Sequence, residues 1–404
     1  MGYKGAMPWK ESVAMDERVQ MVCAYQSGQA KSDLAFAYGV SRKTIYKWLN
    51  RFKHESWDGL RERARAPHAH PNASDPEIVR RIVELRAEHP FWGAPKLRQK
   101  LLEAYGPERT PAESTVSAIL KRHGLTRPAG RIARATPSSA PLRHVTAANQ
   151  LWTIDVKGQF YLGNRARCYP LTLCDAHSRY LLGCRAYTCM PGIDLAQAAM
   201  KDVFRQHGLP ETIRSDNGSP FASTGLGGLT ELSVWWLRLG IGLERIEPAH
   251  PEQNGRHERM HRTLKEATAN PPRKNLKEQQ RAFDEFQSEY NEQRPHEALG
   301  QQAPTRRYER SARAYPEKLP EQRGYPENWP TCRPNRDGLV RFGGHQFRIS
   351  CALADQYVGF CPVGEKLWAI NFEGMNLGLF DQRNGKVQPW PTGSEKEPPE
   401  DYNI

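Results

Sequence analysis

The middle of the chain contains the stretch Leu151-Trp152-Thr153-Ile154-Asp155-Val156, in which apolar residues recur at every second position. A period of two is typical of a β-strand, because successive side chains point to opposite faces of a sheet. The strand carries one acid, Asp155, towards its end. An isolated Asp is most often a solvated surface carboxylate, so the meaning of Asp155 depends on the acids that follow it.

Two later acids stand in settings of their own. Asp216 follows the strand-like run 211–215 and precedes Asn217-Gly218, a pair that permits a sharp turn. Glu258 comes just after Gly255, in a stretch that runs to Ala269 and is rich in helix formers. The sequence therefore predicts two acids at strand ends and a third on the first turns of a helix.

Two neighbouring strands and a crossing helix could bring these three carboxylates together. Their mutual repulsion would be severe unless cations were bound between them. Hard oxygen ligands favour Mg²⁺ or Mn²⁺, and two such ions about 3.5–4 Å apart can stabilise both oxygens of an in-line displacement at phosphorus. The pattern predicts phosphodiester chemistry.

The segments around the acids resemble the integrase-core superfamily, also called DDE, of insertion-sequence transposases and retroviral integrases. The matching segments are 151–155, 215–221, and 248–255 running on to Lys265. One departure is that 41 residues separate Asp216 from Glu258, more than the superfamily usually has. The glycine-rich residues 222–229 could absorb the excess as a surface loop.

This resemblance implies a site and an activity. Asp155, Asp216 and Glu258 would be both the catalytic residues and the ligands of two Mg²⁺ ions, for which Mn²⁺ can substitute. The partners would be double-stranded DNA, as the terminal inverted repeats of a mobile element and as target DNA, and further copies of the chain, at least as a homodimer on DNA. The expected reaction is DNA strand cleavage followed by strand transfer. Glu247 and Glu252 remain rival third acids, but only Glu258 occupies the family's position on the helix.

The resemblance also implies a ribonuclease-H-like core, which the flanking sequence supports. Further strand-like and helical runs lie at residues 168–174, 180–187, 193–207, 232–239 and 241–246. With the strands that carry Asp155 and precede Asp216 and the helix of Glu258, the order is three strands, helix, strand, helix, strand, long helix. This order predicts a mixed sheet covered by helices. Asp175 is interpreted as a turn carboxylate that pairs with Arg179, and not as a fourth acid of the site.

A competing pattern overlaps the third acid. Residues 257–261 read His-Glu-x-x-His, the pattern of zinc metalloproteases, with His257 and His261 on one helical face. A protease would need a further ligand that the sequence does not offer, and it would leave Asp155, Asp216 and the basic charge unexplained. We expect instead that His261, Arg262 and Lys265 face DNA phosphate.

The charge of the chain favours a polyanionic partner. It has 58 Lys and Arg against 45 Asp and Glu, for a formal net charge of +13. Residues 121–150 contain no acid, and several prolines there argue against regular structure. We interpret residues 128–148 as a basic linker in which Arg131 and Arg134 follow a phosphate backbone.

The N-terminal third predicts two helix-turn-helix units. In the first, helices over 15–27, 31–38 and 41–52 are expected, and Ser41 would cap the third. In the second, helices over 77–88, 94–105 and 112–123 are expected. The residues predicted to contact DNA lie on the third helix of each unit: Ser41, Arg42, Lys43, Thr44, Lys47 and Arg51, and then Ser114, Thr115, Lys121 and Arg122.

The C-terminal part changes character. After a connector rich in proline and charge, short alternating runs between Leu339 and Phe380 are separated by glycine turns. Their regular spacing predicts a small β-barrel, with a disordered tail after it.

The sequence thus predicts a multidomain protein with N-terminal all-α helix-turn-helix units, a central α/β ribonuclease-H-like core with a mixed sheet, and a C-terminal small β-barrel. The expected boundaries are 1–65, 66–127, the linker 128–148, the core 149–300, the connector 301–334, the barrel 335–388 and the tail 389–404.

The eight cysteines show no Cys-x-x-Cys pair and no zinc-finger spacing, and the sequence has no long apolar run, which favours a cytoplasmic protein with reduced thiols and no membrane segment. The resemblance implies that it is bacterial and nucleoid-associated. A DNA-binding regulator with a catalytically inert core is the main alternative, since it would bind DNA repeats without nicking them.

Overall fold

The computed structural model describes residues 14–63, 74–126, 143–156, 158–247 and 250–390. The chain divides into two compact units, Met1–Ala73 and Ser74–Ile404, and each is described by itself. Most of the predicted basic linker, with Arg131 and Arg134, and nearly all of the predicted tail lie outside the described residues. No helix of the described segments is both long and apolar enough to cross a membrane.

The first unit is a three-helix bundle. It consists of α1 (Ala14–Gln26), α2 (Lys31–Ala37) and α3 (Arg42–Glu55), followed by a short 3₁₀ helix. Gly39 has a φ of +61° in the turn between α2 and α3, a conformation that glycine adopts without a steric penalty. The Ser41 hydroxyl accepts a hydrogen bond from the Thr44 backbone N–H at 3.2 Å and so caps α3 as predicted.

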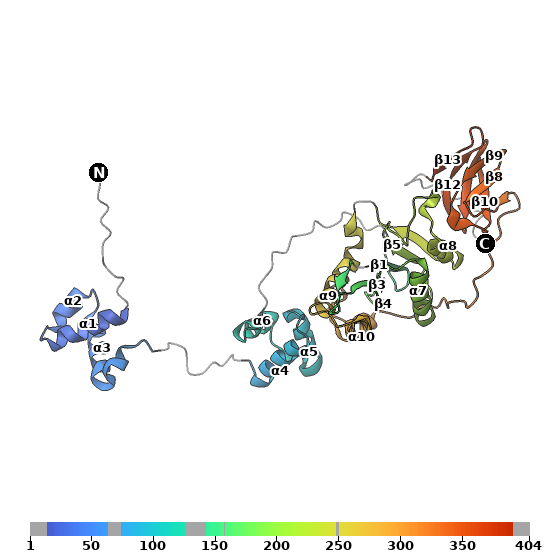
Figure 1. Cartoon of the computed structure of the whole chain (residues 1–404). Coiled ribbons are helices and arrows are strands. Elements are labelled where there is room, and N and C mark those ends of the chain that lie inside the picture. Colours follow the sequence, from blue (N-terminus) through green and yellow to red (C-terminus); the bar gives the residue numbers. More distant parts are fainter. Residues whose placement is uncertain (1–13, 64–73, 127–142, 157, 248–249, 391–404) are drawn as a thin grey trace, which may run out of the picture. The chain divides into compact units, whose positions relative to one another are not determined.

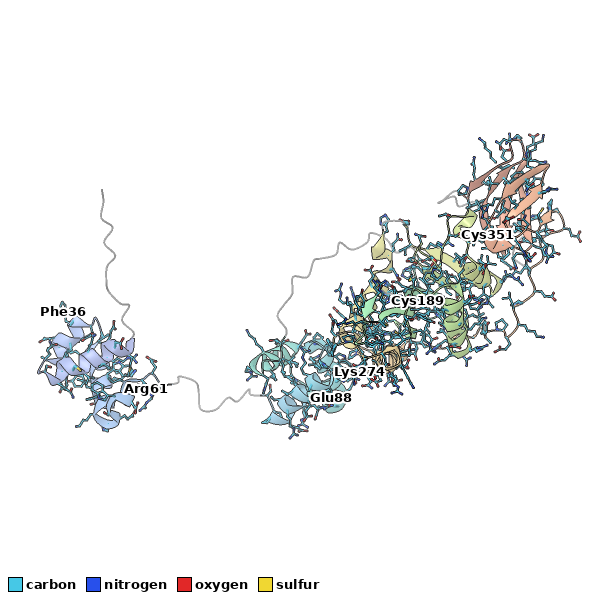
Figure 2. All side chains as sticks on the ribbon, in the orientation of Figure 1. Phe36, Arg61, Glu88, Cys189, Lys274 and Cys351 are labelled. Atoms are coloured by element: carbon cyan, nitrogen blue, oxygen red, sulfur yellow. The ribbon has the colours of Figure 1, made fainter. Side chains whose placement is uncertain are left out.

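Apolar side chains from all three helices fill the centre of this bundle. Val22, Leu34 and Ile45 are fully buried, and Trp48 is covered on one side by the guanidinium of Arg18, 3.9 Å from the ring centre. Phe36 lies on the surface of the unit with 91% of its area exposed (Figure 2). Tyr25, Val40, Tyr46 and Trp57 are exposed to a smaller extent.

A second group of three helices begins the larger unit. These are α4 (Pro76–Glu88), α5 (Ala94–Arg109) and α6 (Glu113–Arg122), which agree with the predicted helices at their starts. They pack around Ile82, Leu97 and Ile119. α5 continues beyond its predicted end with a kink at Gly106, where φ is +73°.

The central sheet contains six strands. They are β1 (Leu151–Val156), β2 (Phe160–Tyr161), β3 (Arg167–Asp175), β4 (Leu181–Tyr187), β5 (Thr212–Ser215) and β6 (Gly242–Arg245). The order is β2-β3-β1-β5-β6, with β4 also paired to β3. β1 is antiparallel to β3 and parallel to β5, and β5 is parallel to β6, so the predicted mixed sheet is confirmed.

Helices cover both faces of this sheet (Figure 1). On one face α7 (Ile193–His207) and α8 (Glu231–Arg238) pack against Trp152 and Ile154 of β1. On the other face α9 (Gly255–Thr268) and α10 (Leu276–Ser288) pack against Cys174 of β3. The alternation of side chains along β1 therefore decides which residues face α9.

Polar side chains of α10 and the turn that follows it cover the exposed edge of β4. The Gln280 amide accepts from the Ala186 N–H and donates to the Cys184 carbonyl, both at 2.8 Å. The Asn291 amide makes the same pair of bonds to the N–H and carbonyl of Leu181, at 2.8 and 2.9 Å. These side chains satisfy backbone groups that an unprotected edge strand would offer to another chain.

The C-terminal region is an open sheet and not the predicted barrel. Five strands follow the order β13-β12-β11-β10-β7, and a separate hairpin pairs β8 with β9. Their bounds are Thr331–Cys332 for β7, Leu339–Phe342 for β8, His345–Arg348 for β9, Val358–Gly364 for β10, Leu367–Phe372 for β11, Met375–Asp381 for β12 and Lys386–Pro389 for β13. The hairpin packs on the sheet through stacked rings: Phe342 on Phe360 at 4.0 Å and Phe347 on Phe380 at 4.2 Å.

The C-terminal sheet and helix α8 share one apolar cluster. Leu229, Val234 and Leu237 of the core are buried together with Val358 and Phe372. Residues 223–225 of the glycine-rich segment are exposed, as expected of a surface loop, whereas Leu226 and Leu229 pack against the C-terminal sheet.

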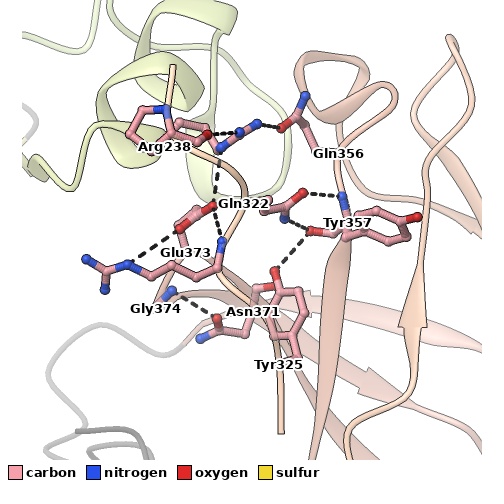
Figure 3. A network of polar contacts seen from close by, with 10 residues as sticks. Arg238, Gln322, Tyr325, Gln356, Tyr357, Asn371, Glu373 and Gly374 are labelled. Carbon is pink, nitrogen blue, oxygen red and sulfur yellow. Dashed lines mark hydrogen bonds and ion pairs between the residues drawn. The ribbon is translucent and has the colours of Figure 1, made fainter. Parts of the chain in front are cut away.

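A polar network borders this interface (Figure 3). Arg238 of α8 lies 3.4 Å from the Glu373 carboxylate and donates to Gln356 at 2.6 Å. Both side chains of the pair are largely buried, and burial raises the pKa of Glu373 in spite of the neighbouring guanidinium groups. The Glu373 carboxylate consequently depends on Arg238 for compensation of its charge.

The connector predicted over residues 301–334 lies against the core. The Leu209 N–H donates to the Arg313 carbonyl at 2.7 Å, and the Ser311 N–H donates to the His207 carbonyl at 3.0 Å. Arg313 in turn donates to the Pro210 and Leu239 carbonyls, at 2.7 and 2.8 Å. These bonds tie the connector to the segments that lead into β5 and β6.

Replacing Arg238 with Met should destabilise the larger unit by about 3 kcal/mol at pH 8, because a buried carboxylate loses its main countercharge. The pKa of Glu373 is already above its ordinary value, so the penalty is full above that pKa and falls as the pH decreases towards 4.5. Thermal unfolding should therefore show a smaller deficit at pH 5 than at pH 8. Arg80→Met, which breaks an exposed pair with Glu84, is the control and should change little. An equal deficit at both pH values would contradict this account.

Candidate active site

Asp155 and Asp216 lie at corresponding positions on neighbouring strands. β1 and β5 run parallel, with Leu151 opposite Thr212 and Thr153 opposite Arg214. Continuing this register by two residues brings Asp155 level with Asp216, directly after the end of β5. Since paired strands are about 4.8 Å apart, the two acids start from adjacent backbone positions.

Asp155 belongs to the face of the sheet that α9 covers. Thr153 and Asp155 are two residues apart on β1, so they share a face, while Trp152 and Ile154 point to the opposite core. The Thr153 hydroxyl contacts His257 Nδ1 of α9 at 2.6 Å. Asp155 Oδ2 lies 3.5 Å from His261 Nδ1 of the same helix.

Arg214 links β5 to the segment that leads into α9. Its side chain is buried, pairs with the Glu244 carboxylate on β6, and donates from Nη1 to the Gln253 carbonyl at 3.0 Å. A guanidinium bridges these elements well because its planar fork can serve two acceptors at once. The turn before α9 is thereby held near the end of β5.

Glu258 lies on the exposed side of α9. His257, Met260, His261 and Leu264 are buried against the sheet and α10, whereas Glu258, Arg262 and Lys265 are exposed. Because residues three, four and seven positions apart share a helical face, the acid and the two cations form one row. This agrees with the expected positions of Glu258, Arg262 and Lys265.

Asp216 has an oxygen that lacks a donor. Its Oδ1 atom is buried and has no hydrogen-bond partner in the part of the chain that the structure describes. Burial raises the pKa of Asp216, and the hydrogen bond from the Gly218 backbone N–H offsets only part of that effect. A buried acceptor of this kind fits a bound cation, which would compensate its charge.

The carboxyl groups do not form a closed metal cluster. No three His, Cys, Asp or Glu side chains of the described residues are grouped so that they could hold a metal ion. The structure aligns the two aspartates and places the helix of Glu258 against β1 and β3. The joint binding of metal by all three acids stays a prediction.

His261 does not face DNA phosphate, contrary to the sequence-based expectation. It is fully buried, and its Nε2 atom contacts the Thr172 hydroxyl at 2.6 Å. His257 is buried as well, with both ring nitrogens occupied by the hydroxyls of Thr153 and Thr172. This arrangement leaves His257 unsuited to be a zinc ligand and argues against the protease alternative.

Asp175 has the structural role that the sequence predicts, but its partners differ from the expected one. Its Oδ2 atom accepts from the Ser178 N–H and hydroxyl, at 2.7 and 2.6 Å, and Oδ1 accepts from the Asn149 N–H at 2.8 Å. It therefore holds the turn after β3 without Arg179. Glu247, one of the rival third acids, is exposed near His250.

The predicted DNA-contact residues of the helical units occupy the starts and outer faces of α3 and α6. Arg42, Lys43 and Lys47 are exposed, and Lys47 and Arg51 lie beside the ring of Trp48. The hydroxyls of Ser41 and Thr44 bond to each other at 2.9 Å within the cap. On α6, Ser114, Lys121 and Arg122 are exposed and Thr115 is half-buried.

The sequence indicated that His257 and His261 flank the metal site, but Thr153 and Thr172 were not identified as their partners. The threonines lie inside apolar strand patterns, where a hydroxyl gives no sign of its partner. Only the spacing of His257 and His261 by four residues indicated a shared helical face.

Family models match three parts of the chain. Two models described as integrase core domain match residues 145–251 and 239–304. A helix-turn-helix domain matches residues 17–68, and a homeodomain-like domain matches residues 44–120. Residues 145–304 therefore match integrase core models, and the segments before them match helix-turn-helix and homeodomain-like models, which confirms the predicted resemblance.

A curated relative is the uncharacterised 31.7 kDa protein of insertion element IS407 from Burkholderia multivorans. It is 29% identical over 161 residues, which cover 39% of this chain and 55% of the relative. The chain thus matches about half the length of that protein.

Three solved structures match this chain at low sequence identity and low TM-score. The catalytic core of the HTLV-2 integrase in complex with magnesium is 15% identical with a TM-score of 0.33, covering 42% of this chain and all of that one. The integrase of the simian T-cell lymphotropic virus intasome, in complex with a PP2A regulatory subunit, is 15% identical with a TM-score of 0.36, covering 72% and 96%. The catalytic core of the BIV integrase is 18% identical with a TM-score of 0.29, covering 39% and 92%.

Replacing Asp216 with Asn should raise the melting temperature in metal-free buffer at pH 7.5 by about 1–2 °C, since an ionised carboxylate that burial disfavours is removed. Because its pKa is raised, this cost is present above the shifted pKa and disappears as the pH falls towards 3.8, so the gain should shrink in acid. Asp202→Asn, at an exposed acid on α7, is the matched control. A marked loss of stability in Asp216→Asn would show that its charge is structurally required.

Proposed function

We propose that this chain, which carries an integrase core domain behind helix-turn-helix units, is a DNA transposase that cleaves and transfers DNA strands at the ends of a mobile element. The observation that carries the proposal is the alignment of Asp155 with Asp216 on the parallel strands β1 and β5, together with the packing of α9, the helix of Glu258, against β1. The matches to the integrase core models and to an insertion-element protein support it.

Asp155, Asp216 and Glu258 would hold two Mg²⁺ ions, or Mn²⁺ in their place. When bound, such ions lower the barrier by stabilising the attacking and leaving oxygens of a phosphodiester. The donor set fits hard cations because it consists of carboxylate oxygens, one of them buried without a donor at Asp216.

The exposed row on α9 supplies the positive charge that a DNA strand needs. Arg262 and Lys265 follow Glu258 at four and seven residues, so they would hold backbone phosphates on the side of the helix where the acid lies. Arg214 would act at a distance from DNA, by keeping the start of α9 at the end of β5.

The helical units would recognise the terminal inverted repeats. Arg42, Lys43 and Lys47 lie exposed at the start and side of α3, the part of a helix-turn-helix unit that enters the major groove. Two ends must be joined in transposition, so at least two copies of the chain would assemble on DNA.

Asp155→Asn, Asp216→Asn and Glu258→Gln should each lower Mg²⁺-dependent strand cleavage by at least about 10³-fold while leaving DNA binding intact, because they remove metal ligands and not DNA contacts. The measurement is cleavage of labelled duplexes taken from both flanks of the gene, with Mg²⁺ or with chelator, alongside a binding assay on the same duplexes.

Glu247→Gln is the matched control, since it neutralises the exposed rival acid and should cleave as the unaltered chain does. Binding of the flanking duplexes with no cleavage by the unaltered chain would favour the inert regulator instead.

Lys43→Ala should weaken binding of the first unit to the repeats and reduce the slope of log affinity against log salt by about 1, as expected for one lost phosphate contact. Lys53→Ala, in the last turn of the same helix, is the control with the same charge change and should leave the slope nearly unchanged. Binding titrations at several salt concentrations would measure the slope for both variants. Equal slopes for the two variants would argue against α3 as the DNA-recognition helix.

A further inference from the structure

A line of polar side chains is buried between α9 and the sheet. It consists of Thr153 on β1, Thr172 on β3, and His257 and His261 on α9, none more than 6% exposed. Buried hydroxyl and imidazole groups are costly unless they bond to one another, so their pairing is constrained. The line ends at Asp155, one of the proposed metal ligands.

The contacts run in one sequence from β1 to Asp155. Thr153 Oγ1 is 2.6 Å from His257 Nδ1, and His257 Nε2 is 2.7 Å from Thr172 Oγ1. Thr172 Oγ1 is 2.6 Å from His261 Nε2, and His261 Nδ1 is 3.5 Å from Asp155 Oδ2. His257 thus bonds to hydroxyls through both of its nitrogens. His261 bonds through Nε2, and its Nδ1 atom lies at ion-pair distance from the carboxylate without an aligned hydrogen bond to it.

Each threonine hydroxyl also has a backbone carbonyl as an alternative acceptor, at a longer distance. Thr153 Oγ1 lies 3.4 Å from the Cys174 carbonyl, and Thr172 Oγ1 lies 3.2 Å from the Asp155 carbonyl. The bonds to the imidazoles are shorter by more than 0.5 Å in Thr153 and in Thr172, so the hydroxyl protons belong in the line.

Only one direction of donation suits the carboxylate at the end. In that direction Thr153 donates to His257, His257 donates to Thr172, Thr172 donates to His261 Nε2, and His261 presents its Nδ1–H to Asp155. In the opposite direction His261 would present a nitrogen lone pair to the Asp155 carboxylate, which is repulsive in a buried setting. The carboxylate therefore selects the first direction.

We propose that His261 is a positioning residue, whose Nδ1–H orients the Asp155 carboxylate for metal, and that Thr153, His257 and Thr172 fix the tautomer that makes this possible. The inference rests on the proposed function, because Asp155 matters only if it binds metal. Residues that orient a ligand in this way typically change metal affinity about 10- to 100-fold when they are lost.

The contact with His261 matters because Asp155 lies near the end of β1, where its side chain is partly exposed. Its side chain is 22% exposed, on the next-to-last residue of β1, so packing alone does not fix its rotation. An Nδ1–H at this point would hold one oxygen, and ordering the side chain in advance would spare part of the entropy that metal binding must otherwise overcome.

Two amide substitutions separate this role from a purely structural one. An Asn amide nitrogen reaches about the place of Nδ1, so His261→Asn should keep the donor towards Asp155. A Gln amide oxygen reaches about the place of Nε2 and can accept from the Thr172 hydroxyl, so His261→Gln should keep the contact with Thr172 and lose the one with Asp155. Both variants remove the ring, and any general loss of packing should affect them alike.

The test uses the full chain with Mn²⁺ or Mg²⁺ alone as the probe, and it follows the rise in melting temperature as the ion is titrated. We expect the apparent dissociation constant to increase about 10- to 100-fold in His261→Gln and less than about 3-fold in His261→Asn. A purely structural role predicts lower melting temperatures but the same ion affinity in both variants, which would overturn the proposal.

Asp155→Asn provides the reference for the site itself. If the unaltered chain responds to Mn²⁺ and Asp155→Asn does not, the metal site exists, and an unchanged response in His261→Gln would then refute only the role of His261. If the melting temperature of the unaltered chain does not rise with Mn²⁺, or rises equally in Asp155→Asn, the proposed function and this inference fail together.

A spectroscopic measurement does not depend on any variant being stable under titration. Long-range ¹H–¹⁵N spectra of the chain labelled with ¹⁵N-histidine report which ring nitrogen carries the proton, and the His261 signals are those lost in His261→Asn. We expect the Nδ1–H tautomer for His261 and the Nε2–H tautomer for His257. The Nε2–H tautomer at His261 would overturn the proposal.

Discussion

The packing of α9 on the sheet through buried polar side chains is the constraint on which the candidate site depends. His257 and His261 can be buried only where they meet Thr153 and Thr172, because an unpaired buried imidazole would be costly. Any rotation of the helix, or a shift by one turn, would break these bonds. The match between two helical and two strand residues therefore fixes both the rotation and the axial position of α9, and with them the exposed side on which Glu258 lies.

The same constraint explains which parts of the site could be predicted. Local periodicity is enough to find β1, β5 and α9, since strand and helix repeats differ in period. The parallel register that aligns Asp155 with Asp216 is not a local property, and it entered the prediction only through the resemblance. The exposure of His261 was predicted wrongly, because spacing shows that two histidines share a face but not whether that face meets solvent or the sheet.

The C-terminal sheet shows a similar limit. Turn spacing predicts most of its strands, but two short ones, β7 and β13, have no clear periodic signal. Closure into a barrel requires strand number, tilt and stagger to agree across the whole sheet, which no local pattern determines. Here the apolar face is covered by the β8–β9 hairpin and by α8 of the core, so burial is achieved without closure.

The residues between Asp216 and Glu258 link the candidate site to the C-terminal sheet. Their excess length was expected to form a surface loop, yet Leu229 is buried against the C-terminal sheet, and Arg245 of β6 donates to the carbonyls of Gly227 and Gly228 at 3.0 and 2.8 Å. The segment therefore leaves the site at Asp216, contacts the C-terminal sheet, and returns through α8 and β6 to the turn before α9. A displacement of that sheet would act on the segments that carry the second and third acids, whereas Asp155 is held separately by β1 and its neighbours.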